Sequence, residues 1–258
     1  MIPAWLSILN AILAVLLLLI GIGGAHFLLL PSVGGADPAM VGFYLTLLSF
    51  LFAALAVLFG LLGIARTAAP ERRVGRPKAL AGTLLGLVIA VPLGLMGWRW
   101  MSMPYPEIND ITTNYDTPPE FVKPPNLSPD SMKYDHSKFQ PVQSKEYPKL
   151  DPLRLDEKPD DAFAKVSAAA HTMPGWQIVD DDKATRTIEG VETSNLFRFR
   201  DDFIIQVRPD LDANSSLVEM RSRSRDGTGD FGVNYKRIRA FFAMLKPGGG
   251  DAGTASPS

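Results

Sequence analysis

Three long apolar runs, none containing a charged residue, dominate the first hundred positions of this 258-residue chain. They cover residues 5–30, 40–65 and 80–98, which makes two of them 26 residues long and the third 19. A helix needs about 20 apolar residues to cross the hydrocarbon core of a bilayer. The sequence therefore predicts three transmembrane helices, with the lipid bilayer as the first expected partner.

A cleaved secretory signal peptide is the alternative interpretation of the first run. Such a signal starts with a positive charge and has an apolar core of about 7–15 residues. No Lys or Arg precedes Arg66. We therefore expect the first helix to remain in the mature chain.

The short loops predict how the helices are oriented. Residues 66–78 contain five basic residues and one acidic residue, whereas residues 31–39 contain only Asp37. Basic short loops face the cytoplasm. The sequence thus predicts a multi-pass protein of a bacterial inner (plasma) membrane. Its N-terminus would be cytoplasmic, and everything after the third helix would form a periplasmic domain in the cell envelope.

Charge and cysteine content exclude several classes of function. Only eight charged residues precede Met101, and the remaining positions hold 20 basic and 25 acidic residues, a net charge of −5. This balance argues against a nucleic-acid partner. The absence of cysteine excludes disulfides, thiolate zinc sites and a cysteine nucleophile. His136 and His171 have no ligand-type neighbours at metal spacing, so we expect no metal and no cofactor.

Residues 101–157 are predicted to form a proline-rich extended segment, because residues 101–159 hold 11 of the 21 prolines. Apolar residues within it, including Ile108, Ile111 and Phe121, suggest that parts of the segment lie along a folded domain. Residues 247–258 are rich in Gly, Ser, Ala and Pro and are predicted to be a disordered tail.

Residues 158–246 show the pattern of a compact α+β domain. A helix is expected over 159–173, followed by strands over 176–179, 185–193, 196–208 and 216–225, and by a closing helix over 230–245. The expected fold is thus a three-helix transmembrane bundle (1–100), joined through the extended segment to a domain with an antiparallel sheet flanked by two helices.

Arginines alternate along two of the expected strands and suggest an anion-binding or partner-binding surface. Alternate residues of a strand share one face, and guanidinium groups bind phosphates and carboxylates with two hydrogen bonds. The alternative is a solvated face with ion pairs to Asp202, Glu219, Glu189 or Glu192. The candidate residues are Arg198, Arg200, Arg221, Arg223 and Arg225.

Asn234 is a second candidate, because an amide on the apolar stripe of a helix must find hydrogen-bond partners. We expect it to clamp the preceding loop within a polar network that includes Asp201, Asp202 and Asp230. No serine-histidine-aspartate order, phosphate loop or dinucleotide motif is present, so no catalytic residue is assigned.

Several stretches resemble the family known as domain of unknown function 1499, from bacteria and plastids. The similarity covers approximately residues 106–245. The matching stretches are residues 106–113, 118–121, 147–148, 191–193, 199–202, 221–234 and 236–239, with Phe242. The resemblance implies an α+β domain behind N-terminal membrane helices and carries no known activity.

Two functions are compatible with these observations. The first is a non-enzymatic membrane protein whose domain binds a protein partner or an anionic envelope component. The second is a hydrolase-type enzyme that uses Asp201, Asp202 and Asp230 with the neighbouring arginines. The two differ in whether those carboxylates converge in one pocket or point apart.

Overall fold

The computed structural model describes residues 2–33, 36–68, 74–123, 133–212 and 214–246. It divides the chain into two compact units. The first, here called the helical unit, is Met1–Met103 with Asn195–Arg198, and the second, here called the module, is Pro104–Ser194 with Phe199–Ser258. The tail expected to be disordered, 247–258, lies outside the described residues.

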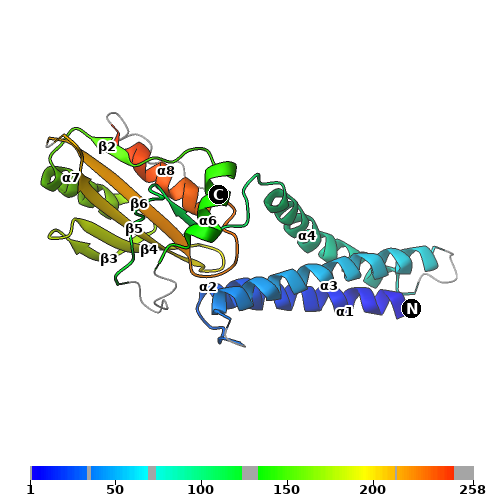
Figure 1. The fold of residues 1–258 in the computed structure, drawn as a ribbon. Helices are drawn as coiled ribbons and strands as arrows, with labels where there is room; N and C mark the ends of the chain where they lie inside the picture. The colour runs from blue at the N-terminus through cyan, green and yellow to red at the C-terminus, as the bar shows by residue number, and fades with distance from the viewer. Residues whose placement is uncertain (1, 34–35, 69–73, 124–132, 213, 247–258) are drawn as a thin grey trace. The chain divides into compact units, whose positions relative to one another are not determined.

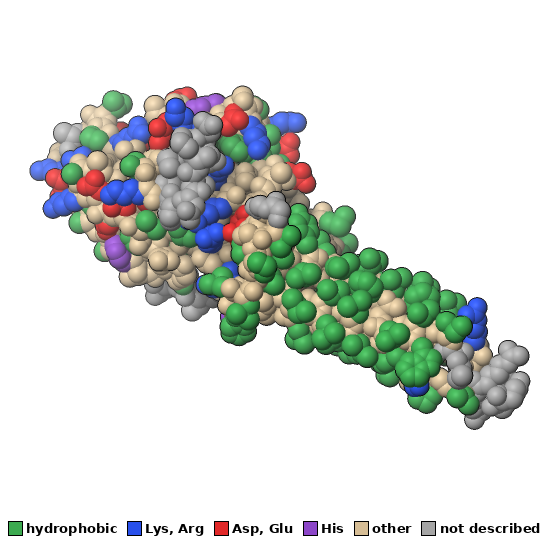
Figure 2. Space-filling view, turned by 90° about the horizontal axis from the view of Figure 1, so that it is seen from below, with side chains coloured by type: hydrophobic (Ala, Val, Ile, Leu, Met, Phe, Trp, Pro, Cys, Tyr) green, Lys and Arg blue, Asp and Glu red, His purple; other side chains and the backbone are tan. Residues whose placement is uncertain are grey.

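The helical unit contains the three expected long apolar helices (Figure 1). The first runs through α1 (Ile2–Leu18), the π-helical turn η1 (Leu19–Gly23) and α2 (Gly24–His26), and it is followed by α3 (Pro38–Arg66) and α4 (Arg76–Met101). Each is long and apolar enough to cross a membrane. Large apolar side chains cover the outside of these helices (Figure 2), as expected where the solvent is lipid.

Small residues let the three helices approach each other closely. A Cβ atom added at Gly60 would lie within 3 Å of Thr83 Oγ1, Ser7 Oγ and the Ala79 carbonyl oxygen. Gly82 is equally close to Ser7, whose hydroxyl donates to the Ala56 carbonyl at 2.8 Å. Glycines at such crossings permit backbone contact in the absence of a hydrophobic driving force.

The module is built on a six-stranded antiparallel sheet. Its strands are β1 (Asp110–Thr112), β2 (Leu153–Leu155), β3 (Trp176–Asp182), β4 (Thr187–Thr193), β5 (Arg200–Pro209) and β6 (Ser216–Ser224). Their order is β1-β6-β5-β4-β3, and β2 pairs with the other half of β6. The expected antiparallel sheet is confirmed.

Helices α7 (Pro159–Thr172) and α8 (Val233–Leu245) pack on one face of the sheet (Figure 1). The core between them contains Phe203 and Ile205 of β5, Phe163 of α7 and Phe241 of α8, all at most 4% exposed. These residues repeat at strand spacing on β5 and at helical spacing on α7 and α8, as the sequence predicts. We call the opposite side of the sheet the open face.

Some strand bounds and the course of the proline-rich segment differ from the expectation. Strand β5 corresponds to the strand expected over 196–208, but it begins at Arg200. The chain turns at Arg198, which has a left-handed backbone conformation with φ 65°. The segment 104–157 belongs to the module. It supplies β1, β2, core residues such as Ile108 and Ile111, and the unpredicted helix α6 (His136–Glu146).

Candidate functional site

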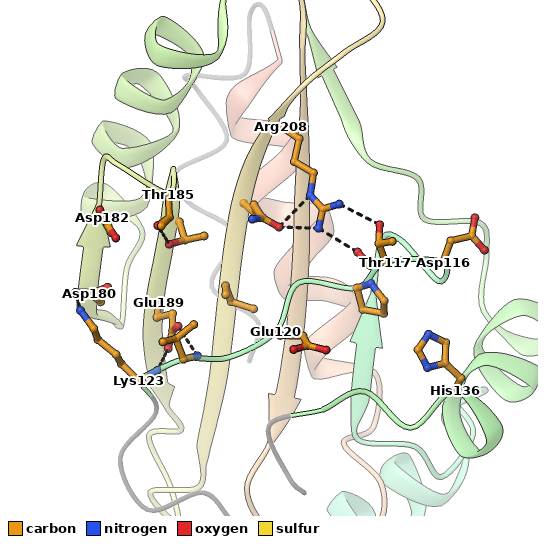
Figure 3. Close-up of a pocket in the computed structure, with 15 residues that line it drawn as sticks. Asp116, Thr117, Glu120, Lys123, His136, Asp180, Asp182, Thr185, Glu189 and Arg208 are labelled. Atoms are coloured by element: carbon orange, nitrogen blue, oxygen red, sulfur yellow. Dashed lines mark hydrogen bonds and ion pairs between the residues drawn. The ribbon is translucent and has the colours of Figure 1, made fainter. Parts of the chain in front are cut away.

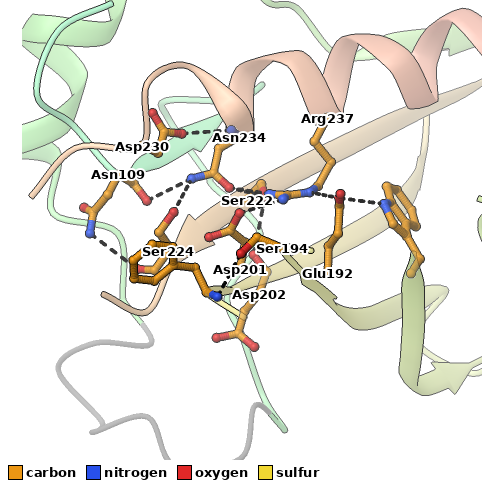
Figure 4. Close-up of polar contacts among 12 residues, drawn as sticks. Asn109, Glu192, Ser194, Asp201, Asp202, Ser222, Ser224, Asp230, Asn234 and Arg237 are labelled. Atoms are coloured by element: carbon orange, nitrogen blue, oxygen red, sulfur yellow. Dashed lines mark hydrogen bonds and ion pairs between the residues drawn. The ribbon is translucent and has the colours of Figure 1, made fainter. Parts of the chain in front are cut away.

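A buried polar cluster joins α8 to the ends of β4, β5 and β6 (Figure 4). At its centre Asn234 is fully buried. Its Oδ1 accepts hydrogen bonds from Ser222 Oγ, at 2.7 Å, and from Arg237. Its Nδ2 donates to Ser224 Oγ at 3.0 Å and to the Asn109 carbonyl at 3.3 Å. The amide therefore uses all of its hydrogen-bonding capacity within the protein.

Arg237 extends this cluster toward two carboxylates. Its guanidinium donates to Glu192 Oε2 and, at 2.6 Å, to Asp201 Oδ2. The Trp176 indole donates to the same Glu192 oxygen at 3.1 Å. Burial lowers the pKa of Arg237, but the charges of Asp201 and Glu192 outweigh it, so the net direction is upward. The guanidinium is a permanent cation held between two anions.

Asp230 fixes the loop in front of α8. Its carboxylate accepts from the backbone N–H groups of Gly232 and Asn234, both at 2.8 Å. Burial raises the pKa of Asp230, and these hydrogen bonds oppose the shift. Asp201, Asp230 and Asn234 thus meet in one network, whereas Asp202 points away from it (Figure 4).

Asp202 lies on the open face and binds an arginine there. It receives two hydrogen bonds from Arg225, at 2.8 and 2.7 Å. On the adjoining strand Arg221 binds Asp110 in the same way, at 2.9 and 2.7 Å. Arg223 lies directly opposite both aspartates in the strand register, and burial lowers its pKa.

The expected arginines thus occupy three different environments. Arg221 is fully buried with Asp110, and its guanidinium also lies over the rings of Phe121 and Tyr134. Arg200, Arg223 and Arg225 are partly exposed and, by strand alternation, share the open face with Asp202. Arg198 precedes the strand and lies outside this group. We call Arg200, Arg223 and Arg225 the arginine face.

A second feature of the open face is a shallow hollow of about 620 Å³ (Figure 3). A strap formed by residues 113–123 borders it, and Glu189 holds the strap through the backbone N–H groups of Val122 and Lys123, at 2.7 and 2.9 Å. Its lining contains two basic residues, Lys123 and Arg208, and these acids: Asp116, Glu120, Asp180, Asp182 and Glu189. Among the described residues no group of three or more His, Asp or Glu side chains is placed to hold a metal ion.

Sequence reasoning missed Asp110 and Arg237, and it named Glu189 only as a possible ion-pair partner of the arginines, not as the residue that holds the strap. Arg237 had a signal of the same kind as Asn234, because it lies three residues later on the buried side of the same helix. Asp110 had no signal, since it is recognised only by its partner across the sheet, and nothing in the sequence pointed to the contact between Glu189 and the strap.

The sequence was also compared with known proteins. A family model described as "Protein of unknown function (DUF1499)" matches residues 110–245. The chain therefore belongs to the DUF1499 family. The matched region begins at β1 and ends at the last residue of α8, so it includes the sheet, Asn234 and Arg237 of the buried polar cluster, the arginine face and the hollow. No curated protein matches the sequence.

Proposed function

We propose that this DUF1499 protein is a non-enzymatic integral membrane protein whose module binds an anionic envelope component or an acidic surface of a protein partner through the arginine face. One observation carries the proposal. Arg200, Arg223 and Arg225 are partly exposed and, by strand alternation, gather three guanidinium groups on one side of the sheet.

Asp110 and Asp202 already accept paired hydrogen bonds from Arg221 and Arg225. Guanidinium groups bind anions with several acceptor oxygens, such as a phosphate or a carboxylate, through paired hydrogen bonds, and this is the ligand chemistry that the arginine face offers. Arg221 is too deeply buried to reach a ligand. Its role in the proposal is to hold β1 against β6 beneath the arginine face.

The hydrolase alternative has less support. Asp201 is held by Arg237, and Asp230 is held by two backbone N–H groups. Both carboxylates lie on the side of the sheet that α8 covers. Asp202 points away from them and is held by Arg225. A general acid and base must reach the same reacting group, and this arrangement divides the three carboxylates between two faces of the sheet.

We further propose that the N-terminus is cytoplasmic and the module extracytoplasmic. Arg66 ends α3, and Arg76 and Lys78 begin α4. The Lys78 ammonium lies 3.4 Å from the centre of the Trp5 ring in α1. The start of α1 and the basic loop are therefore at one end of the helical unit, which the positive-inside rule assigns to the cytoplasm.

Affinity capture from detergent-solubilised membranes tests the binding proposal. The tagged full-length protein is compared with Arg200→Gln/Arg223→Gln and with Lys183→Gln, a control at an exposed turn. The double variant should recover less of the bound lipid or protein while keeping its melting temperature, and wild-type recovery should fall as salt is raised. Equal recovery by all three proteins, with no salt response, would refute the arginine face as a binding surface.

A further inference from the structure

The exposed side of α8 carries positive charge only. Its exposed positions are Val233, Lys236, Arg239, Ala240 and Ala243, and exposed Lys246 follows the helix. The cations fall at intervals of three and seven residues, so they line one side of the helix. No acidic residue occurs between 231 and 246. By contrast, α7 carries Asp160 and Asp161 alongside its Lys165.

Two apolar side chains are exposed where α8 begins. Phe231 is 46% exposed and Val233 is 42% exposed. Phe231 has a left-handed backbone conformation with φ 54°, which is costly for a residue with a side chain and points to a functional constraint. The carboxylate of Asp230, the residue before Phe231, accepts from the backbone N–H groups of Gly232 and Asn234, which follow it. The backbone that carries the apolar tip is therefore fixed by hydrogen bonds.

The chain between α4 and the residues that pack beside this tip is short. Only residues 102–104 separate Met101, the last residue of α4, from Tyr105. Within the module the Tyr105 ring packs against Gly232 and lies under the Lys236 ammonium, 5.0 Å away. Four residues of extended chain span at most about 14 Å. A bilayer crossed by α4 is thus within reach of the start of α8.

We infer that Phe231, Val233, Lys236 and Arg239 form a docking surface for anionic phospholipid headgroups, distinct from the arginine face. Aromatic and aliphatic side chains enter the headgroup region, and nearby lysine and arginine side chains bind the phosphates. A basic row without acids complements a negatively charged lipid surface. An acidic protein partner would also account for the positive charge. It would not account for an exposed apolar tip beside Tyr105, which lies a few residues after a helix long enough to span the membrane.

The absence of cysteine makes a direct test possible. Full-length Val233→Cys, carrying an environment-sensitive fluorophore, is placed in nanodiscs that contain headgroup nitroxide lipid. The discs are made with phosphatidylglycerol or with phosphatidylcholine alone. Leu211→Cys, at a fully exposed position between β5 and β6, is the matched control. We expect quenching at residue 233 in phosphatidylglycerol discs, much weaker quenching in phosphatidylcholine discs, and none at residue 211.

Lys236→Gln/Arg239→Gln provides the second arm. Each removed cation should lower the ratio of docked to free module by roughly fivefold, and added salt should act in the same direction. Equal quenching at residues 233 and 211 in anionic discs would overturn the inference, as would quenching at 233 that ignores lipid charge, salt and the double variant. Because Arg200 and Arg223 are unchanged, this result is independent of the capture experiment.

Discussion

Asn234 and Arg237, one turn apart on α8, share the hydroxyl of Ser222: it donates to the Asn234 amide oxygen at 2.7 Å and accepts from Arg237 Nη1 at 2.8 Å. Arg237 also donates to the same amide oxygen. This triangle locks α8 onto β6, and through Asn109 and Ser224 it locks the segment before β1 as well. Loss of these hydrogen bonds is therefore expected to destabilise the packing of α8 and of the segment before β1 on the sheet.

The first prediction concerns Asn234. Replacement by Leu keeps the number of side-chain heavy atoms and continues the apolar stripe of α8, but it leaves the groups of Ser222, Ser224 and Asn109 without their partner, which costs about 1–3 kcal/mol. Thermal unfolding of the full chain in detergent should show a melting temperature several degrees lower. Ala243→Leu, at an exposed position of the same helix, should have little effect. Unchanged stability of Asn234→Leu with loss of binding would make Asn234 a ligand-contacting residue instead.

The second prediction concerns the buried pair of Arg221 and Asp110. Arg221→Met leaves the Asp110 carboxylate buried without its cation, and the free energy of unfolding should fall by about 3–5 kcal/mol. Arg221→Met/Asp110→Leu should recover most of this loss. Arg154→Met, which removes an ion pair from a half-exposed side chain, should cost at most about 1 kcal/mol. A double variant as unstable as the single one would contradict the assignment.

A pH dependence follows from Glu189. Burial raises its pKa above the ordinary 4.5, although the N–H groups of Lys123 and Val122 partly oppose the shift. The folded protein then binds this proton more tightly than the unfolded chain, so stability from this site is lost as pH rises from about 4.5 through the folded pKa.

Unfolding free energies of wild type and Glu189→Gln, measured across this range, isolate the effect. Asp230 shifts in the same direction, but it is present in both proteins and cancels in the difference. The stability advantage of wild type over the variant should shrink as pH rises. An advantage that grows with pH would mean that the folded pKa of Glu189 lies below its ordinary value.

The helical unit supplies a matched pair of glycines. A Cβ atom at Gly60 would collide with Thr83 and Ser7, whereas at Gly97 it would meet nothing within 4 Å. Gly60→Ala should therefore lower the temperature at which the full chain aggregates in detergent, and Gly97→Ala should not. If Gly60→Ala instead changed only the oligomeric state, the glycine would serve a contact between copies.

The elements carried by strong periodicity could be predicted from the sequence. Uniform hydrophobicity indicates the three long helices, and alternation on β5 places Phe203 and Ile205 on the core face. The expected strand 196–208 wrongly includes Phe197 and Phe199, because nothing in the pattern marks the left-handed turn at Arg198. Likewise, Asp180–Asp182 look like turn residues but continue β3, where Lys123 binds Asp180 at 2.8 Å.

The candidate site could be predicted only in part, because its partners are distant in the chain. Arginine alternation is visible, but 111 residues separate Arg221 from Asp110. The sequence alone therefore does not distinguish a buried structural arginine from its exposed neighbours on the same strand. An amide on the apolar stripe of a helix is visible in the sequence itself, so Asn234 could be identified. Its hydrogen bonds to Ser222 and Asn109 depend on the tertiary structure and could not be predicted.

Measuring the membrane topology tests the account most directly. Single cysteines introduced into this cysteine-free chain make the measurement possible. Val74→Cys lies in the exposed part of the basic loop and Leu211→Cys in the module. In bacterial cells with a permeabilised outer membrane, a membrane-impermeant maleimide should label Leu211→Cys at once and Val74→Cys only after the inner membrane is lysed. Labelling of Val74→Cys in intact cells, with Leu211→Cys protected until lysis, would contradict an extracytoplasmic DUF1499 module.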